Sequence, residues 1–128
     1  MKEYIQENRE RFFEELFSLL RIPPISAKQD HKKDMERCAE RLKELLLEAG
    51  ADEAGVYPSK GNPVVFGKKI INPEWKTVMV YGHYDVQPPE PLEKWHTDPF
   101  EPVIKQDPTG QEAIYARGAN DDKGQLFM

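Results

Sequence analysis

At residues 77–86 the chain reads TVMVYGHYDV, an uninterrupted apolar run that leads directly into polar side chains. A continuous apolar run of this kind predicts a strand over 77–81 that is covered on both faces of a sheet. Ligand sites in open α/β sheets lie just beyond the carboxyl ends of strands. Side chains two positions apart in extended backbone point the same way, so we expect His83 and Asp85 to share one face at such a site.

His83 and Asp85 have the residue types of a metal ligand and its partner. A histidine that binds a metal usually donates its other ring N–H to a carboxylate, which fixes the tautomer and raises the basicity of the ligand. A lone histidine after a strand is more often structural or merely exposed. This motif alone therefore leaves both interpretations open.

A second polar motif, Asp121-Asp122-Lys123-Gly124, follows Arg117 and Gly118. Adjacent carboxylates can hold a metal cation, and one carboxylate can bridge two metals. Two aspartates in front of a helix also form an ordinary N-cap, which the helix dipole favours. On its own, this motif is as compatible with a helix cap as with a metal site.

Local patterns predict the elements around the two motifs. Apolar residues at three- and four-residue steps predict helices over 3–21 and 32–49. The first helix should end before Pro23 and the second at Gly50, with Asp30 or Ser26 as a cap for the second.

Strands are predicted over 55–57, 63–68 and 112–115, and residues 87–108 form a stiff, proline-rich irregular excursion. Residues 125–128 resemble the first turn of another helix. Helices followed by strands, with alternation resuming at the end, predict an α/β fold in which helices flank a mixed sheet.

Composition excludes several classes of protein. The 128 residues suit one domain or part of one, and the net charge of −5 gives no basic face for nucleic acid. No apolar run approaches the roughly 18 residues of a membrane span. Cys38 is the single cysteine, so no disulfide can form within the chain. We expect a cytoplasmic protein in which Cys38 is a small buried apolar residue on the second helix.

The motif at residues 82–86 precedes the motif at 118–124, and the sequence WHTDPFEP lies between them at residues 95–102. Together with the two opening helices and the strand near 62–65, they resemble the N-terminal part of the M20 family of metallopeptidases, in particular its aminoacyl dipeptidases and carnosinase-like enzymes. The resemblance covers nearly the whole chain. It implies that residues 1–128 are the N-terminal part of a zinc peptidase catalytic domain, with the rest of that domain and a lid and dimerisation domain outside them.

The resemblance also implies a role for each matching residue. His83 matches the first zinc ligand of the family, and Asp85 matches the catalytic carboxylate that orients it. Asp121 matches the aspartate that bridges two metals, and its peptide bond to Asp122 is expected to be cis. The implied cofactor is a pair of Zn²⁺ ions, with Mn²⁺ or Co²⁺ as alternatives.

The implied activity is hydrolysis of dipeptides or short peptides by a protein that forms a homodimer when complete. The family's general base and remaining ligands lie downstream of residue 128, so we expect this chain alone to be inactive. A deacylase or desuccinylase of the same family is an alternative. A truncated, non-catalytic binding module is another, and such a module should expose apolar patches and oligomerise.

Other polar residues have simpler expectations. His31 is expected to be exposed at a helix start, and His96 to be exposed or packed within the proline-rich excursion. Arg117 and Lys123 flank the second motif. They are expected to balance its negative charge or to pair with surface carboxylates.

Overall fold

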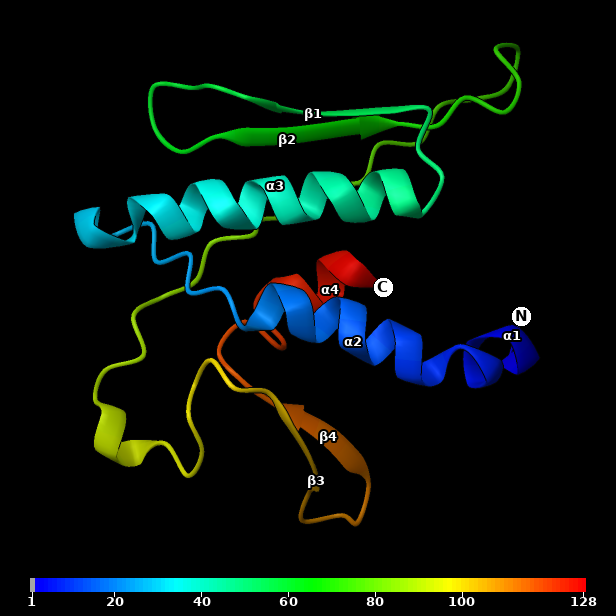
Figure 1. Ribbon diagram of the computed structural model, residues 1–128. Helices are drawn as coiled ribbons and strands as arrows, with labels where there is room; N and C mark the ends of the chain where they lie inside the picture. Colours follow the sequence, from blue (N-terminus) through cyan, green and yellow to red (C-terminus); the bar gives the residue numbers. More distant parts are fainter. Residues whose placement is uncertain (1) are drawn as a thin grey trace.

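The computed structural model describes residues 2–128 as helices and two small sheets stacked in layers (Figure 1). The helices are α1 (Lys2–Glu7), α2 (Arg9–Leu20), α3 (Lys32–Glu48) and α4 (Lys123–Phe127), with 3₁₀ turns at Gln29–His31 and Leu92–Lys94. The strands are β1 (Glu53–Tyr57), β2 (Val64–Lys68), β3 (Val103–Gln106) and β4 (Glu112–Tyr115). The β1–β2 hairpin covers one side of α3, while α2 and α4 lie on its other side.

The opening helix is interrupted at Asn8, where a single helix was predicted. The Asn8 side-chain amide donates a hydrogen bond to the carbonyl oxygen of Tyr4 at 2.9 Å. Asparagine side chains compete with the backbone for helical carbonyls in this way. The prediction of one continuous helix is therefore wrong by one turn, and α2 carries the buried apolar face.

The helix α3 begins and ends where the helix over 32–49 was predicted. It ends before Gly50, whose φ of +94° is the left-handed conformation that glycine adopts easily. The predicted cap is wrong. No side-chain cap bond is formed at its N-terminus, because a 3₁₀ turn that contains Asp30 precedes the helix and Ser26 lies further away.

Two small clusters make up the core, both against α2. Leu19 on α2 and Cys38 on α3 belong to the cluster between these helices, together with Ile22 and Leu45. Leu16, Phe17 and Leu20 form the second cluster and face β3, β4 and the segment before α4. The side chains of α2 thus hold both halves of the chain together, and the predicted burial of Cys38 is confirmed at 0% exposure.

The strand predicted over 77–81 is absent from the structure. Val78, Met79, Val80 and Tyr81 are 82–89% exposed. Within residues 2–128 the strands pair only as β1 with β2 and β3 with β4, both antiparallel. A strand needs backbone partners at its edges, and neither hairpin supplies them here. The apolar pattern is real, but the described residues do not cover it.

The proline-rich stretch is more ordered than predicted. It contains the 3₁₀ turn Leu92–Lys94 and ends in β3, which pairs with the correctly predicted β4 from Val103↔Tyr115 to Gln106↔Glu112. The strand β3 was not predicted, because it is short and directly follows Pro102 in a proline-rich stretch. The predicted α/β class is confirmed, with its strands in two separate hairpins.

Candidate metal centre

The two polar motifs meet at one point on the surface. His83 Nε2 lies 3.1 Å from Asp121 Oδ1, although the residues are 38 positions apart. On the other side of the ring, His83 Nδ1 lies 3.1 Å from Asp85 Oδ1 and 3.2 Å from the Asp85 carbonyl oxygen. The three residues singled out from the sequence therefore form one continuous chain of polar contacts.

Alternation along an extended segment sets these directions. His83 and Asp85 point to the same side, as their spacing predicts, while the intervening Tyr84 points elsewhere. The Tyr84 hydroxyl donates to the carbonyl oxygen of Pro63 at 2.5 Å. That bond ties the segment to the β1–β2 hairpin and leaves the histidine on the open side.

Asp122 joins the two motifs through the backbone. Its Oδ2 accepts a hydrogen bond from the backbone N–H of His83 at 3.1 Å, and its peptide bond to Asp121 is cis, as the resemblance implies. A Cβ on Gly82 would lie 2.8 Å from Asp122 Oδ2. The absence of a side chain at Gly82 therefore lets Asp122 approach. The helix-cap interpretation is not supported, since Asp122 makes no side-chain cap bond to α4.

Lys123 is buried below the site, contrary to the expectation of a surface charge. Its side chain is 1% exposed, and Nζ donates to the carbonyl oxygens of Leu19 and Ile22, both at 2.7 Å. These carbonyls lie at the C-terminal end of α2, where the helix dipole favours a cation. Lys123 thus fastens the second motif to α2, a role that sequence reasoning missed because the partners are about 100 positions away.

Arg117 also has a role different from the one expected. Its guanidinium lies 5.0 Å from the centroid of the Trp95 ring and donates to the carbonyl oxygen of Pro88 at 3.2 Å. The Trp95 indole N–H donates to the Pro89 carbonyl oxygen at 2.7 Å. These contacts fix the proline-rich excursion to the segment that leads into Asp121.

Ser26 contacts the centre from the loop after α2. Its hydroxyl donates to Asp85 Oδ2 at 2.5 Å, and the Val86 backbone N–H donates to the Pro24 carbonyl oxygen at 3.0 Å. The sequence carried no signal for this contact, because Ser26 and Asp85 are 59 positions apart.

The other histidines are separate from this centre. His31 is half-buried, and its Nδ1 lies 2.9 Å from Asp34 Oδ2, so the expectation of an exposed ring is wrong. His96 is exposed, as expected.

The electrostatic surroundings of His83 favour its charged form. Partial burial lowers the pKa of His83, but the hydrogen bond to the Asp85 carbonyl oxygen and the carboxylates of Asp85 and Asp121 together outweigh this effect, and the pKa is raised above its ordinary value. The same two carboxylates would also attract a metal cation. A carboxylate therefore lies beside each nitrogen of this ring.

The pair His83 and Asp121 fits two ligands of one metal ion. Zinc bonds of about 2.0–2.2 Å at a tetrahedral angle place two ligand atoms roughly 3.4 Å apart, and the observed separation is 3.1 Å. Asp85 holds Nδ1, which leaves Nε2 for the metal. Within residues 2–128, however, no group of three or more potential ligands gathers at one point. His83 and Asp121 are therefore two candidate ligands, without a third at the same point among the described residues.

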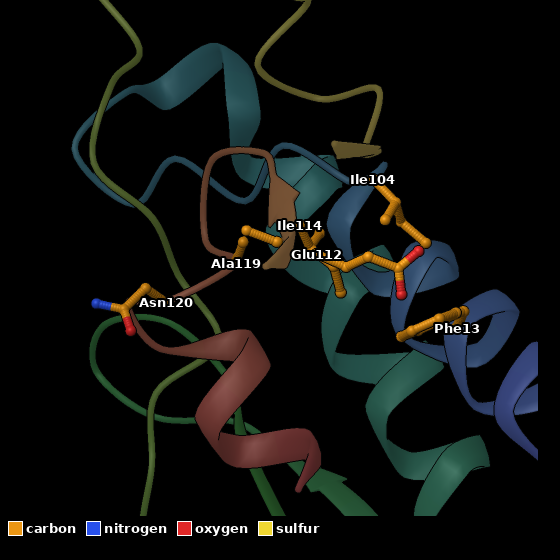
Figure 2. Close-up of a pocket in the computed structure, with 7 residues that line it drawn as sticks. Phe13, Ile104, Glu112, Ile114, Ala119 and Asn120 are labelled. Carbon is orange, nitrogen blue, oxygen red and sulfur yellow. The ribbon is translucent and has the colours of Figure 1, made fainter. Parts of the chain in front are cut away.

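A mostly apolar groove lies between α2 and the β3–β4 hairpin, and its one acidic lining residue, Glu112, is paired with Arg9 (Figure 2). Phe13 on α2 and Ile104 and Ile114 on the β3–β4 hairpin line it, and its far end reaches Asn120, the neighbour of Asp121. Its cavity volume is about 360 Å³. None of the three residues of the candidate centre lines this groove.

A histidine between two aspartates is compatible with a metal site, and the chain is similar to metal-dependent peptidases. Residues 79–128 match the model of peptidase family M20/M25/M40. The predicted resemblance to the M20 metallopeptidases is thereby confirmed, and the chain is related to them along nearly its whole length. Within residues 2–128 no helix has the length and apolarity to cross a membrane.

Particular relatives are dipeptidases. The Cys-Gly metallodipeptidase DUG1 of Candida albicans is 33% identical over 94% of this chain and 27% of its own length. The cysteinylglycine-S-conjugate dipeptidase of Corynebacterium striatum is 31% identical over 94% of this chain and 26% of its own. The chain thus spans about a quarter of the length of the curated relatives it matches.

Solved structures agree in fold. The dipeptidase Dug1p of Saccharomyces cerevisiae superimposes with a TM-score of 0.82 at 30% identity, over 97% of this chain and 28% of that one. The M20 metallo-carboxypeptidase Sso-CP2 of Sulfolobus solfataricus gives 0.78 at 37% identity, over 91% of this chain and 24% of that one. Both matches support the partial α/β domain described above.

Proposed function

We propose that this chain is the N-terminal part of the catalytic domain of a dinuclear zinc dipeptidase, to which it contributes His83, Asp85 and Asp121. The observation that carries the proposal is the 3.1 Å approach of His83 Nε2 to Asp121 Oδ1. It occurs in a chain related to metallodipeptidases. A second carboxylate, that of Asp85, lies beside the opposite ring nitrogen, which is the usual arrangement of a metal-binding histidine.

Each residue has a distinct part in this proposal. His83 would hold a metal ion through Nε2, and the Asp121 carboxylate would hold it from the other side and could be shared with a second ion. Asp85 accepts a hydrogen bond from Nδ1–H of His83 and so keeps the lone pair of Nε2 available. A bound zinc pair would polarise the scissile carbonyl and lower the pKa of the attacking water. Manganese or cobalt could take the same nitrogen and oxygen donors.

The proposed substrates are dipeptides and short peptides, with Cys-Gly as the first to test. Three fungal relatives are Cys-Gly metallodipeptidases. A bacterial relative is a cysteinylglycine-S-conjugate dipeptidase. These relatives favour peptides over N-acyl amino acids as substrates.

Residues 1–128 alone are proposed to be inactive. A catalytic zinc normally has about three protein ligands, and within residues 2–128 no cluster of three is formed. The general base, the remaining ligands and a dimerising lid domain would come from a longer chain. The intact mass of the native gene product tests this directly, because a mass matching 128 residues would contradict it. A cytoplasmic location is part of the proposal, since a single cysteine needs no oxidising compartment.

Zinc titration of the purified chain tests the ligand assignment. Competition with a metallochromic indicator should show binding that is lost in His83→Ala and in Asp121→Ala. His96→Ala is the matched control, since this exposed histidine is not part of the centre, and it should bind as the wild type does. Equal loss in all three variants would contradict the assignment. Turnover of Cys-Gly by the purified chain, abolished by His83→Ala, would contradict its proposed inactivity.

A further inference from the structure

Ser26 makes a contact that its position in the fold does not otherwise require. The residue is exposed, so its hydroxyl is not buried in the core. It also caps no helix, because α3 begins at Lys32 and has no side-chain cap bond. The one hydrogen bond of its side chain goes to Asp85. The contact with Asp85 is therefore the one interaction that could give the Ser26 side chain a role.

The loop that carries Ser26 is held firmly against the segment of the first motif. Pro24 and Ile25 are at most 2% exposed, and Val86 is 4% exposed. The Val86 backbone N–H donates to the Pro24 carbonyl oxygen at 3.0 Å. Further along, Lys28 forms an ion pair with Glu90. Contacts on both sides of Ser26 thus keep its hydroxyl in place opposite Asp85.

The two oxygens of Asp85 have different partners. Oδ2 accepts from the Ser26 hydroxyl at 2.5 Å, which is the short distance typical of a hydroxyl bound to a carboxylate. Oδ1 lies 3.1 Å from His83 Nδ1. The terminal torsion of an aspartate is broad when nothing holds it. With one oxygen fixed by Ser26, the other is directed at the histidine.

We propose that Ser26 is a positioning residue for the metal centre, acting through Asp85 on the tautomer and orientation of His83. The inference rests on the proposed metal site and extends it by one residue. Loss of the hydroxyl would leave the Asp85 carboxylate free to turn away from Nδ1. The neutral ring would then more often carry its proton on Nε2, the atom that the metal needs.

The first measurement uses the metal-free chain, so that it does not depend on zinc. The ¹⁵N spectra of the imidazole rings report which nitrogen carries the proton, and the chain has three histidines. Comparison with His83→Ala assigns the signals of His83, and His31 and His96 serve as internal references. In the wild type, the two Asp85 acceptors favour the Nδ1–H form of neutral His83, in competition with the Nε2–H form that Asp121 favours. Ser26→Ala should raise the share of the Nε2–H form and leave the other two rings unchanged.

The second measurement is zinc affinity, by competition with a metallochromic indicator. Ser26→Ala should weaken binding about tenfold, the lower end of the range for partners outside the ligand set. Ser26→Thr keeps the hydroxyl and should restore both the tautomer and the affinity. Ser59→Ala is the matched control, because Ser59 bonds only within the β1–β2 turn, and it should change neither.

Each outcome has a defined meaning. Wild-type tautomer and affinity in Ser26→Ala would overturn the role of Ser26 while leaving the metal site intact. An equal effect of Ser59→Ala would also overturn it, because the change would then be unspecific. If the wild type binds no zinc but Ser26→Ala shifts the tautomer, the positioning role stands and the proposed metal site fails.

Discussion

Gly82 shows how closely the two motifs are packed at the level of single residues. A Cβ at this position would lie 2.7 Å from Leu126 Cδ1 and 2.8 Å from Asp122 Oδ2. Both atoms are at the ends of rotatable side chains, so they can move. This motion would, however, break the hydrogen bond that the Asp122 carboxylate accepts from the His83 backbone N–H.

Gly82→Ala is therefore expected to loosen the centre more than the fold. The free energy of unfolding should fall by about 1 kcal/mol, the lower end of the range for overpacking, as measured by urea unfolding. The backbone amide of His83 should exchange with solvent faster, as measured by hydrogen exchange. Gly61→Ala is the control, since a Cβ there would approach nothing closer than 4.0 Å. Unchanged exchange at His83 in Gly82→Ala would contradict the anchoring role of Asp122.

Lys123 gives a prediction about pH. Burial lowers the pKa of Lys123 to about 8 from the 10.5 of a free lysine. Between these two values the unfolded chain binds more protons than the folded one, so this lysine makes the free energy of unfolding rise with pH. The full gain is on the order of 3 kcal/mol, from 1.36 kcal/mol per unit of pKa.

Lys123→Met isolates this effect from the other titrating groups. Burial raises the pKa of Cys38, and burial raises that of Tyr84 to about 12, which both act in the opposite direction at high pH. Both groups are present in the wild type and in the variant. The contribution of Tyr84 cancels in the difference, whereas that of Cys38 cancels only in part, because the charge of Lys123 lowers the Cys38 pKa. Urea unfolding at pH 7–10 should show the wild type gaining stability relative to Lys123→Met as pH rises. Parallel curves would contradict a buried lysine with a depressed pKa.

At the level of elements, the local sequence pattern correctly predicted those helices and strands that local contacts determine. The helix over 32–49, its stop at Gly50 and the strand at Glu112–Tyr115 all follow from spacing within a few residues. The prediction of a strand over 77–81 was wrong because a strand forms only when other strands pair with its edges. The spacing of apolar residues carries no information about such partners. The short strand Val103–Gln106 was missed because prolines surround it.

In the candidate centre, too, local contacts were predicted from the sequence and long-range contacts were not. His83 and Asp85 share a face because of a two-residue period, which the sequence displays. Their approach to Asp121 was implied only by the resemblance to a family. Ser26 and Lys123 were missed as parts of the centre, since their partners lie 59 and about 100 positions away. Long-range polar contacts of this kind leave no periodic trace in a sequence.

The proline-rich excursion illustrates how an irregular element is held in place. Its fixed point is Trp95, which donates to the Pro89 carbonyl oxygen and lies under the Arg117 guanidinium. Cation–π contacts contribute about 0.5–2 kcal/mol. The adjacent Lys94 ends the 3₁₀ turn and is exposed, which makes it a site for trypsin.

Trp95→Leu should therefore speed up tryptic cleavage after Lys94, because the segment detaches more often when both contacts are lost. Mass spectrometry of a timed digest measures the rate. Cleavage after Lys60, in the β1–β2 turn on another part of the chain, is the internal control and should keep its wild-type rate. Equal acceleration at both sites would indicate global unfolding and would count against a local anchor.

For the molecule as a whole, the most conspicuous surface feature is the apolar segment in front of the candidate centre. Val78 and Val80 are 83% and 82% exposed, and their backbone takes part in neither hairpin. Exposed apolar segments with unpaired backbone groups act as templates for pairing between chains. The isolated chain is therefore expected to self-associate through residues 78–81.

Sedimentation velocity over a range of concentrations tests this expectation with a matched pair of variants. The wild type should show a growing share of dimers or larger species as concentration rises. The double variant Val78→Lys/Val80→Lys should remain monomeric at the same concentrations, because charges block pairing at an exposed edge. Leu92→Lys changes another exposed apolar residue, 57% exposed, in a different part of the chain and should associate as the wild type does. A wild type that stays monomeric throughout would mean that the segment is covered in solution. Association that survives in the double variant would instead assign the contact to another surface, such as the outer face of the β1–β2 hairpin, where Phe66 is half exposed.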